Sequence, residues 1–182
     1  NSNRELDGYI LMHYISVVSG YIACGYNDDA RKVLSYILKE INKNKKLNKD
    51  QYISLSLISL FFLTRIDVDN FENNYIKNSL ELISEINNVF GKGTFIEGYQ
   101  LKEAYVHILI ALSIYFIKKE DSYNAYIMLK ELYFFIVKHV DLKFLYLEKE
   151  LSFVNKKSNN LKHSLKINKI IGKVNEYLSL DK

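Results

Sequence analysis

The 182-residue chain has no proline and no tryptophan, and it has only seven glycines and one cysteine. Tight turns depend on proline and glycine, so their scarcity argues against a β-sandwich or an α/β fold. The lone cysteine, Cys24, cannot form an internal disulfide, which argues against a small secreted scaffold and predicts a cytoplasmic setting. What remains is a set of long helices with short polar links, and the predicted class is all-α.

Strong charge is also missing, because the formal net charge is only +4. Hydrophobic residues make up 48% of the chain and charged residues 25%, which is typical of a globular domain and excludes a disordered tail. We therefore expect residues 1–182 to form a single domain. Since the chain starts at Asn1 without a methionine or a signal-peptide pattern, we expect a fragment of a longer protein.

Hydrophobic residues that recur at steps of three and four predict about eight helices in antiparallel pairs. Polar residues mark expected N-caps at Asn27, Asp141 and Ser158, and Asn48 with Gln51 predicts a capping box. The expected helices are Arg4–Cys24, Asp28–Asn42, Lys49–Arg65, Asn73–Phe90, Gln100–Ile117, Ser122–His139, 141–155 and 158–178.

Two of these helices, Lys49–Arg65 and Gln100–Ile117, are apolar nearly all round. A membrane span needs roughly 20 apolar residues, and both runs are shorter and flanked by charged residues. We interpret them as central, buried helices and expect no membrane insertion.

Two stretches share a spacing of large apolar and small residues. The first is Tyr14-x2-Val17-x3-Tyr21-x3-Gly25-x4-Ala30-x3-Leu34. The second is Leu109-x2-Leu112-Ser113-x2-Phe116-x8-Ala125-x3-Leu129. Both resemble the tetratricopeptide repeat, a helix hairpin in which glycine ends the first helix and a small residue on the second permits close packing. A residue larger than alanine at Ala30 would overpack the hairpin by about 1–3 kcal/mol.

The resemblance implies a right-handed superhelix of helix pairs with a groove for a peptide or protein. Some positions depart from the family: Val18 stands where glycine is preferred, Ile37 where alanine is usual, and Glu120 replaces the turn glycine. The expected helices Lys49–Arg65 and Asn73–Phe90 lack a small residue in the register of the repeat. An irregular helical bundle that shares only the hairpin packing therefore stays open.

No pattern predicts a catalytic, metal or cofactor site. Glu103 and His107 share a helix face but lack a third ligand in register, so a helical pair is the preferred interpretation. Gly91–Thr94 lacks the spacing of a phosphate loop. Cys24 is interpreted as a small core residue. An enzyme fragment remains an alternative, with acidic candidates at Glu97 and in Asp67–Glu72.

A basic stripe runs along the last expected helix, because Lys162, Lys166, Lys169 and Lys173 recur at steps of four, three and four. It has no arginine and no interleaved aromatic residues of its own. A solvated face is therefore preferred to nucleic-acid contact, which is kept as an alternative.

The functional hypothesis is a module that binds a peptide or a protein, with no enzyme activity and no cofactor. Tyr14, Tyr21 and Tyr105 are groove candidates on first helices, although the repeat position of Tyr21 favours the core. The chain is also similar to the tetratricopeptide-like sensor or oligomerisation domain of peptide-sensing bacterial transcriptional regulators, which implies a cytoplasmic regulator and allows a homodimer.

Overall fold

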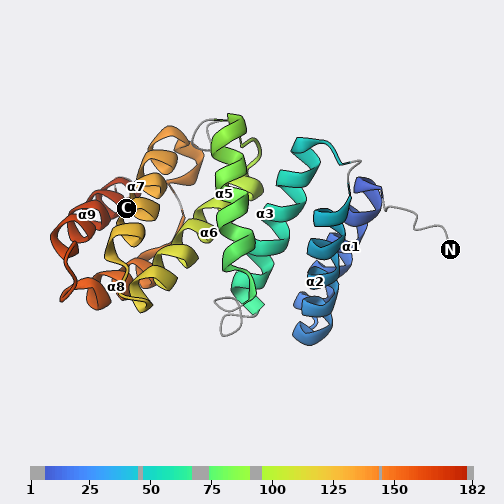
Figure 1. Cartoon of the computed structure of the whole chain (residues 1–182), viewed down its shortest axis with the longest axis horizontal. Coiled ribbons are helices and arrows are strands. Elements are labelled where there is room, and N and C mark those ends of the chain that lie inside the picture. Colours follow the sequence, from blue (N-terminus) through green and yellow to red (C-terminus); the bar gives the residue numbers. More distant parts are fainter. Residues whose placement is uncertain (1–6, 45–46, 67–73, 91–95, 144, 180–182) are drawn as a thin grey trace. The chain divides into compact units, whose positions relative to one another are not determined.

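The computed structural model describes residues 7–44, 47–66, 74–90, 96–143 and 145–179. Within these ranges the chain consists of helices joined by short links and contains no strand, so the all-α class is confirmed (Figure 1). The contacts divide the chain into two compact units, residues 1–82 and 83–182. The α5 helix, Ile76–Phe90, crosses that division.

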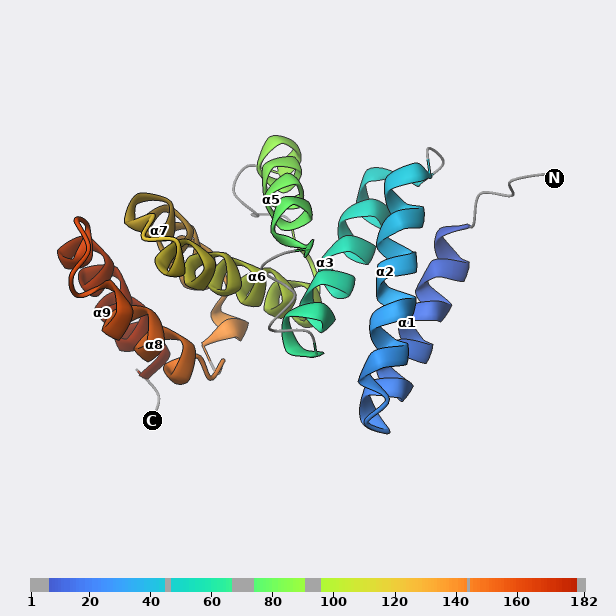
Figure 2. The same cartoon turned by 60° about the horizontal axis from the view of Figure 1, so that its bottom comes forward.

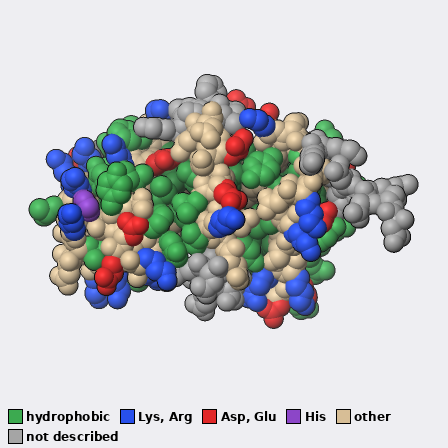
Figure 3. Space-filling model, viewed as in Figure 1, with side chains coloured by type: hydrophobic (Ala, Val, Ile, Leu, Met, Phe, Trp, Pro, Cys, Tyr) green, Lys and Arg blue, Asp and Glu red, His purple; other side chains and the backbone are tan. Residues whose placement is uncertain are grey.

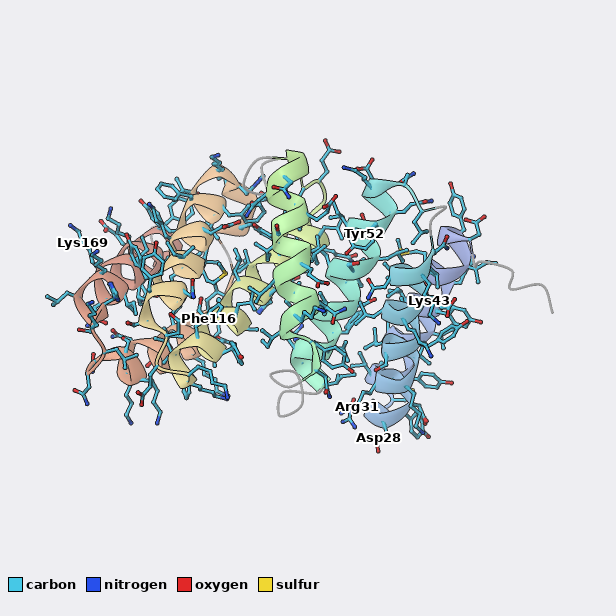
Figure 4. All side chains as sticks on the ribbon, in the orientation of Figure 1. Asp28, Arg31, Lys43, Tyr52, Phe116 and Lys169 are labelled. Carbon is cyan, nitrogen blue, oxygen red and sulfur yellow. The ribbon has the colours of Figure 1, made fainter. Side chains whose placement is uncertain are left out.

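The first unit is built on the helices α1 (Gly8–Ala23), α2 (Asn27–Lys43) and α3 (Lys49–Ile66). The α2 helix packs on both neighbours, and α1 also contacts α3 (Figure 2). The Ser35 and Tyr75 hydroxyls, 2.8 Å apart, link α2 to the residue that precedes α5. In the first turn of α2, Arg31 pairs with Asp28 at 3.2 Å (Figure 4).

The second unit contains α6 (Tyr99–Lys118), α7 (Ser122–Lys138), the 3₁₀ turn η1 (Val140–Leu142), α8 (Glu148–Ser158) and α9 (Ser164–Ser179). The pairs α6–α7 and α8–α9 are hairpins. Because α6 contacts α8 and α7 contacts α9, the hairpins stack with each helix on its counterpart.

The links after α1 and after α6 have the same geometry. Gly25 has φ of 80°, the Tyr26 N–H donates to the Tyr21 carbonyl (2.9 Å) and the Gly25 N–H to Ile22 (3.1 Å). After α6, Glu120 has φ of 59°, and the N–H groups of Asp121 and Glu120 donate to Phe116 (2.8 Å) and Ile117 (3.1 Å). Both are Schellman motifs, which normally place glycine at the left-handed position.

Burial also follows one register in the α1–α2 and α6–α7 hairpins. Ala30 and Ala125 each lie five residues after the left-handed residue, and neither exposes any surface. Leu34 and Leu129, one helical turn further on, are also completely buried. A small residue that contributes no exposed surface lets the paired helix approach closely at that level.

Most of the predicted helix bounds agree with the structure to within one or two residues, and the capping box is confirmed. The Gln51 N–H donates to Asn48 Oδ1 at 2.8 Å, and the Asn48 N–H donates to Gln51 Oε1 at 3.3 Å. The expected cap at Asn27 is wrong, because Asn27 is the first residue of α2 and Tyr26 precedes it as the N-cap. Residues 1–6, the expected start at Asn73 and the Gly91–Thr94 loop lie outside the described residues.

Two further caps are wrong for physical reasons. Asp141 lies in η1, where its carboxylate accepts from Lys102 Nζ at 2.8 Å, and α8 starts only at Glu148. Leu142, Leu145 and Leu147 are buried ahead of α8. Ser158 is the last residue of α8 and not the cap of α9. Its hydroxyl donates back to the Asn155 carbonyl at 3.0 Å, which satisfies the end of α8.

The left-handed Glu120 predicts a stabilising substitution. A residue with a Cβ pays about 1–2 kcal/mol for this conformation, and glycine recovers that cost minus its own chain entropy of about 0.5–1 kcal/mol. We expect Glu120→Gly to raise the free energy of unfolding by about 0.5–1 kcal/mol in urea titrations. Glu120→Ala removes the same carboxylate but keeps the strain, so equal gains in both variants would contradict this explanation.

Candidate functional site

Most of the residues that carry the repeat resemblance lie in the core or at the turns of the hairpins. Ala30, Leu34, Ala125 and Leu129 are completely buried. Gly25 makes the first turn, while Tyr21 and Phe116 (labelled in Figure 4) are half-buried and accept the turn hydrogen bonds through their carbonyls. The exceptions are Tyr14 and Val17, which are exposed on α1.

Tyr105 is a core residue, which corrects the expectation that it faces a groove. Its side chain is completely buried, its ring packs edge-on against Phe135 at 4.7 Å, and its hydroxyl donates to the Glu131 carboxylate. Burial, followed by the Glu131 charge, raises the pKa of Tyr105 far above its ordinary value. The hydroxyl therefore stays protonated and serves to satisfy Glu131 inside the second unit.

Tyr14, by contrast, lies on an exposed apolar face of α1. The α1 stripe consists of Ile10, Tyr14, Val17 and Tyr21, spaced by four, three and four residues on one side of the helix. Ile10 is 43% exposed, Tyr14 37% and Val17 48%. The helix contains no Asp, Glu, Lys or Arg, so nothing charged interrupts this face.

The α2 helix borders the α1 stripe with an aromatic ring and lysines. The Tyr14 and Tyr36 rings meet edge-on at 6.1 Å and 83°. Lys32, Lys39 and Lys43 share the outward side of α2 with Tyr36 and are exposed (Figure 4). Lys32 pairs with Asp29 at 3.2 Å, whereas Lys39 and Lys43 form no ion pair with the residues that the structure describes. The first unit thus presents an apolar strip beside positive charge.

The basic stripe on α9 lies against tyrosines of α7. Lys166 Nζ sits 5.9 Å from the centre of the Tyr126 ring, and Lys173 Nζ sits 5.5 Å from that of Tyr133. The expectation that the stripe lacks aromatic neighbours therefore holds only along α9 itself. Sequence reasoning missed these tyrosines because they belong to a different helix, about forty residues earlier.

A polar cluster joins the start of α6 to η1. Lys102 Nζ bonds to Asp141 Oδ2 at 2.8 Å, and this hydrogen bond, more than the accompanying charge, lowers the pKa of Asp141. The His139 ring packs against Phe135 with the ring centres 4.5 Å apart, and its buried Nε2 has no hydrogen-bond partner among the described residues. Its pKa is lowered, first by burial and then by the positive charge of Lys102.

This cluster does not form a metal centre or a catalytic triad. His107 Nε2 and Glu103 Oε1 lie 3.9 Å apart as a helical pair. Among the described residues, no group of three His, Cys, Asp or Glu side chains is arranged to hold a metal ion. Glu97 is exposed, Asp67–Glu72 lies outside the described residues, and Cys24 is exposed at the end of α1 where a core position was expected.

One described helix, Tyr99–Lys118, is long and apolar enough to cross a membrane, and half of its apolar window is buried within the structure. Comparison with known proteins found no matching family model, no similar curated protein and no similar solved structure.

The lowered pKa of His139 predicts a pH dependence of stability. In the unfolded chain this imidazole takes up a proton near its ordinary pKa of 6.5, whereas the folded protein resists protonation. The unfolded state therefore binds more protons as the pH falls, and stability declines between about pH 7 and 5. We expect His139→Leu to flatten that part of the urea-unfolding profile. Between pH 8 and 9, His139 is neutral in both the folded and the unfolded state, so the free energies of unfolding of the wild type and His139→Leu should differ by a constant amount. If His139→Leu leaves the pH dependence of the unfolding free energy below pH 7 unchanged, His139 is excluded as its cause.

Proposed function

We propose that this chain is a helical module that binds a peptide or a protein, and that the α1 stripe is its contact surface. The observation that carries the proposal is the exposed, uncharged face of α1. Single exposed apolar residues are common on protein surfaces, but a row of them along a whole helix marks an interaction site. Tyrosines within such a row supply contact area at a small cost in side-chain entropy.

The second hairpin supports this interpretation of the α1 stripe. Counted from their left-handed turns, Ile10, Tyr14 and Val17 of α1 correspond to Tyr105, Leu109 and Leu112 of α6. The three residues of α6 are completely buried. The same helix positions thus serve as core in one hairpin and stay exposed in the other, so α1 presents residues of a core-like type at its surface.

An amphipathic helix with an acidic flank is the partner that best fits this surface. Side chains at steps of four, three and four match the i, i+4, i+7 anchors of a helix lying along a helical face. Lys39 and Lys43, which lack ion pairs among the described residues, would face carboxylates beside the apolar anchors. Complementary charge of this kind fixes orientation and speeds association.

The matching turns and burial of the two hairpins also support a tetratricopeptide-like array, because a shared register is what repeated helix pairs would produce. Under this proposal the chain is the cytoplasmic sensor or oligomerisation domain of a bacterial transcriptional regulator. That wider assignment rests on the resemblance alone.

Selection from a library of displayed amphipathic helices tests the proposal. With the wild-type chain as bait, we expect enriched helices to carry apolar residues at i, i+4 and i+7, flanked by Asp or Glu. Val17→Asp should weaken their binding at least tenfold, about the effect of losing one central anchor of roughly 1.4 kcal/mol. Ser16→Asp adds the same charge one residue away, outside the α1 stripe, and should bind as the wild type does.

Three outcomes would count against the proposal. The first is a library from which no helix is enriched, and the second is equal loss of binding in the Val17 and Ser16 variants. The third is a wild-type dimer in sedimentation equilibrium that Val17→Asp converts to a monomer. That result would replace the partner helix by a second copy of this chain.

A further inference from the structure

One ring–ring contact and two lysine–ring contacts, all in a single register, join α7 to α9 and the residue just before α9. The α7–α9 ladder consists of Tyr123–His163, Tyr126–Lys166 and Tyr133–Lys173, with ring or ammonium separations of 5.8, 5.9 and 5.5 Å. In each contact the two residues are forty positions apart, so the helices run parallel. The Ser122 hydroxyl lies 3.1 Å from His163 Nδ1 and ties the first rung to the start of α7.

This ladder lies at the surface of the second unit. Tyr123 is 58% exposed, Lys166 and Lys173 are exposed, and the other two tyrosines are half-buried. Lys130 Nζ lies 5.8 Å from the centre of the exposed Phe134 ring and adds a third lysine–ring contact on α7. Figure 3 shows lysine side chains gathered over α7 and α9 around hydrophobic surface.

Positive charge dominates this surface. Lys162 and Lys169 extend the α9 side of the ladder, and Lys169 points away from the helix (Figure 4). The acidic side chains nearby are few. Glu131 is engaged with Tyr105, Asp121 caps α7 through the Asn124 N–H at 3.1 Å, and Glu176 is the acidic residue on α9. A polyanion would therefore meet a largely cationic strip.

We propose that the α7–α9 ladder binds single-stranded nucleic acid, independently of the α1 stripe. Lysines would contact the phosphates, and the tyrosine rings would stack on unpaired bases, the combination that single-strand binding proteins use. Lys166 and Lys173 are exposed, so each is held over its ring weakly enough to exchange that contact for a phosphate. Ten residues separate the first and last tyrosines, so the rings extend over about 15 Å of helix.

The linear arrangement favours a single strand over other anionic partners. Stacking needs accessible base faces, which a duplex hides and an acidic protein does not have. A membrane surface would be met by a broad apolar face, whereas the ladder is one row along two parallel helices. The three lysines of this row that lie on α9 itself, Lys166, Lys169 and Lys173, predict release of counterions from about three phosphates.

Fluorescence anisotropy with a labelled dT12 oligonucleotide tests the proposal. We expect binding at 50 mM salt, with log affinity falling against log salt at a slope of about −2, from three phosphate contacts on a single strand. Lys166→Gln/Lys173→Gln should lower the affinity at least tenfold and make the slope shallower. Tyr123→Ala should also lower the affinity but leave the slope unchanged, because stacking releases no counterions.

The matched control is Lys39→Gln/Lys43→Gln on α2, which removes the same charge from the first unit. It should bind dT12 within twofold of the wild type, and circular dichroism should show every variant folded. Equal loss in this control would assign binding to net charge and overturn the proposal. No binding of dT12, or duplex DNA bound as tightly as dT12, would overturn it as well. The proposal would also be overturned if phosphatidylserine vesicles or polyglutamate bound in a way that depends on Lys166 and Lys173, while dT12 did not bind.

Discussion

The close packing of two helices at a buried alanine is the constraint on which each matched hairpin depends. Ala30 and Ala125 expose no surface, and each follows a left-handed turn at the same distance. The turn reverses the chain, and the small side chain lets the second helix settle against the first. The leucines one turn further on then fill the space between the helices. A larger residue at either alanine would force the helices apart along their whole length.

The two hairpins share this register but differ in what they present to solvent. Counted from their left-handed turns, the residues of α1 and α6 correspond one to one. On α6, Tyr105, Leu109 and Leu112 are all buried, and Tyr105 contacts Phe135 and Glu131 of its partner α7. On α1 the corresponding residues, Ile10, Tyr14 and Val17, are exposed, and this helix has no Asp, Glu, Lys or Arg. Function is therefore argued from the exposed side of a core-like helix and not from a pocket or a cluster of reactive groups.

Much of the fold was predictable because its strongest signals are local. The periodic apolar residues of α2, the capping box at Asn48 and the turn glycine Gly25 each act within a few residues. Local signals failed where other contacts competed with them. Asp141 and Ser158 are good capping residues, but Asp141 bonds to Lys102 of another helix, and Ser158 bonds to the helix behind it.

The candidate surfaces were harder to predict, because they depend on which helices are neighbours. Periodicity identifies Tyr14 and Tyr105 as equivalent first-helix tyrosines, but only packing shows that one is exposed and the other is buried against Phe135. The α7–α9 ladder forms only because two helices are aligned at an offset of forty residues. The sequence of either helix, taken by itself, does not show this alignment. A stripe of lysines is visible in the sequence, whereas its aromatic partners are not.

The claim that α1 is a binding face can be tested most directly by hydrogen–deuterium exchange of the wild-type chain with and without a saturating helix selected from the library. Residues 8–23, with the adjoining side of α2, should gain protection on binding, while α7 and α9 should exchange as in the free protein. Protection confined to the second unit, or spread evenly over the chain, would contradict the account.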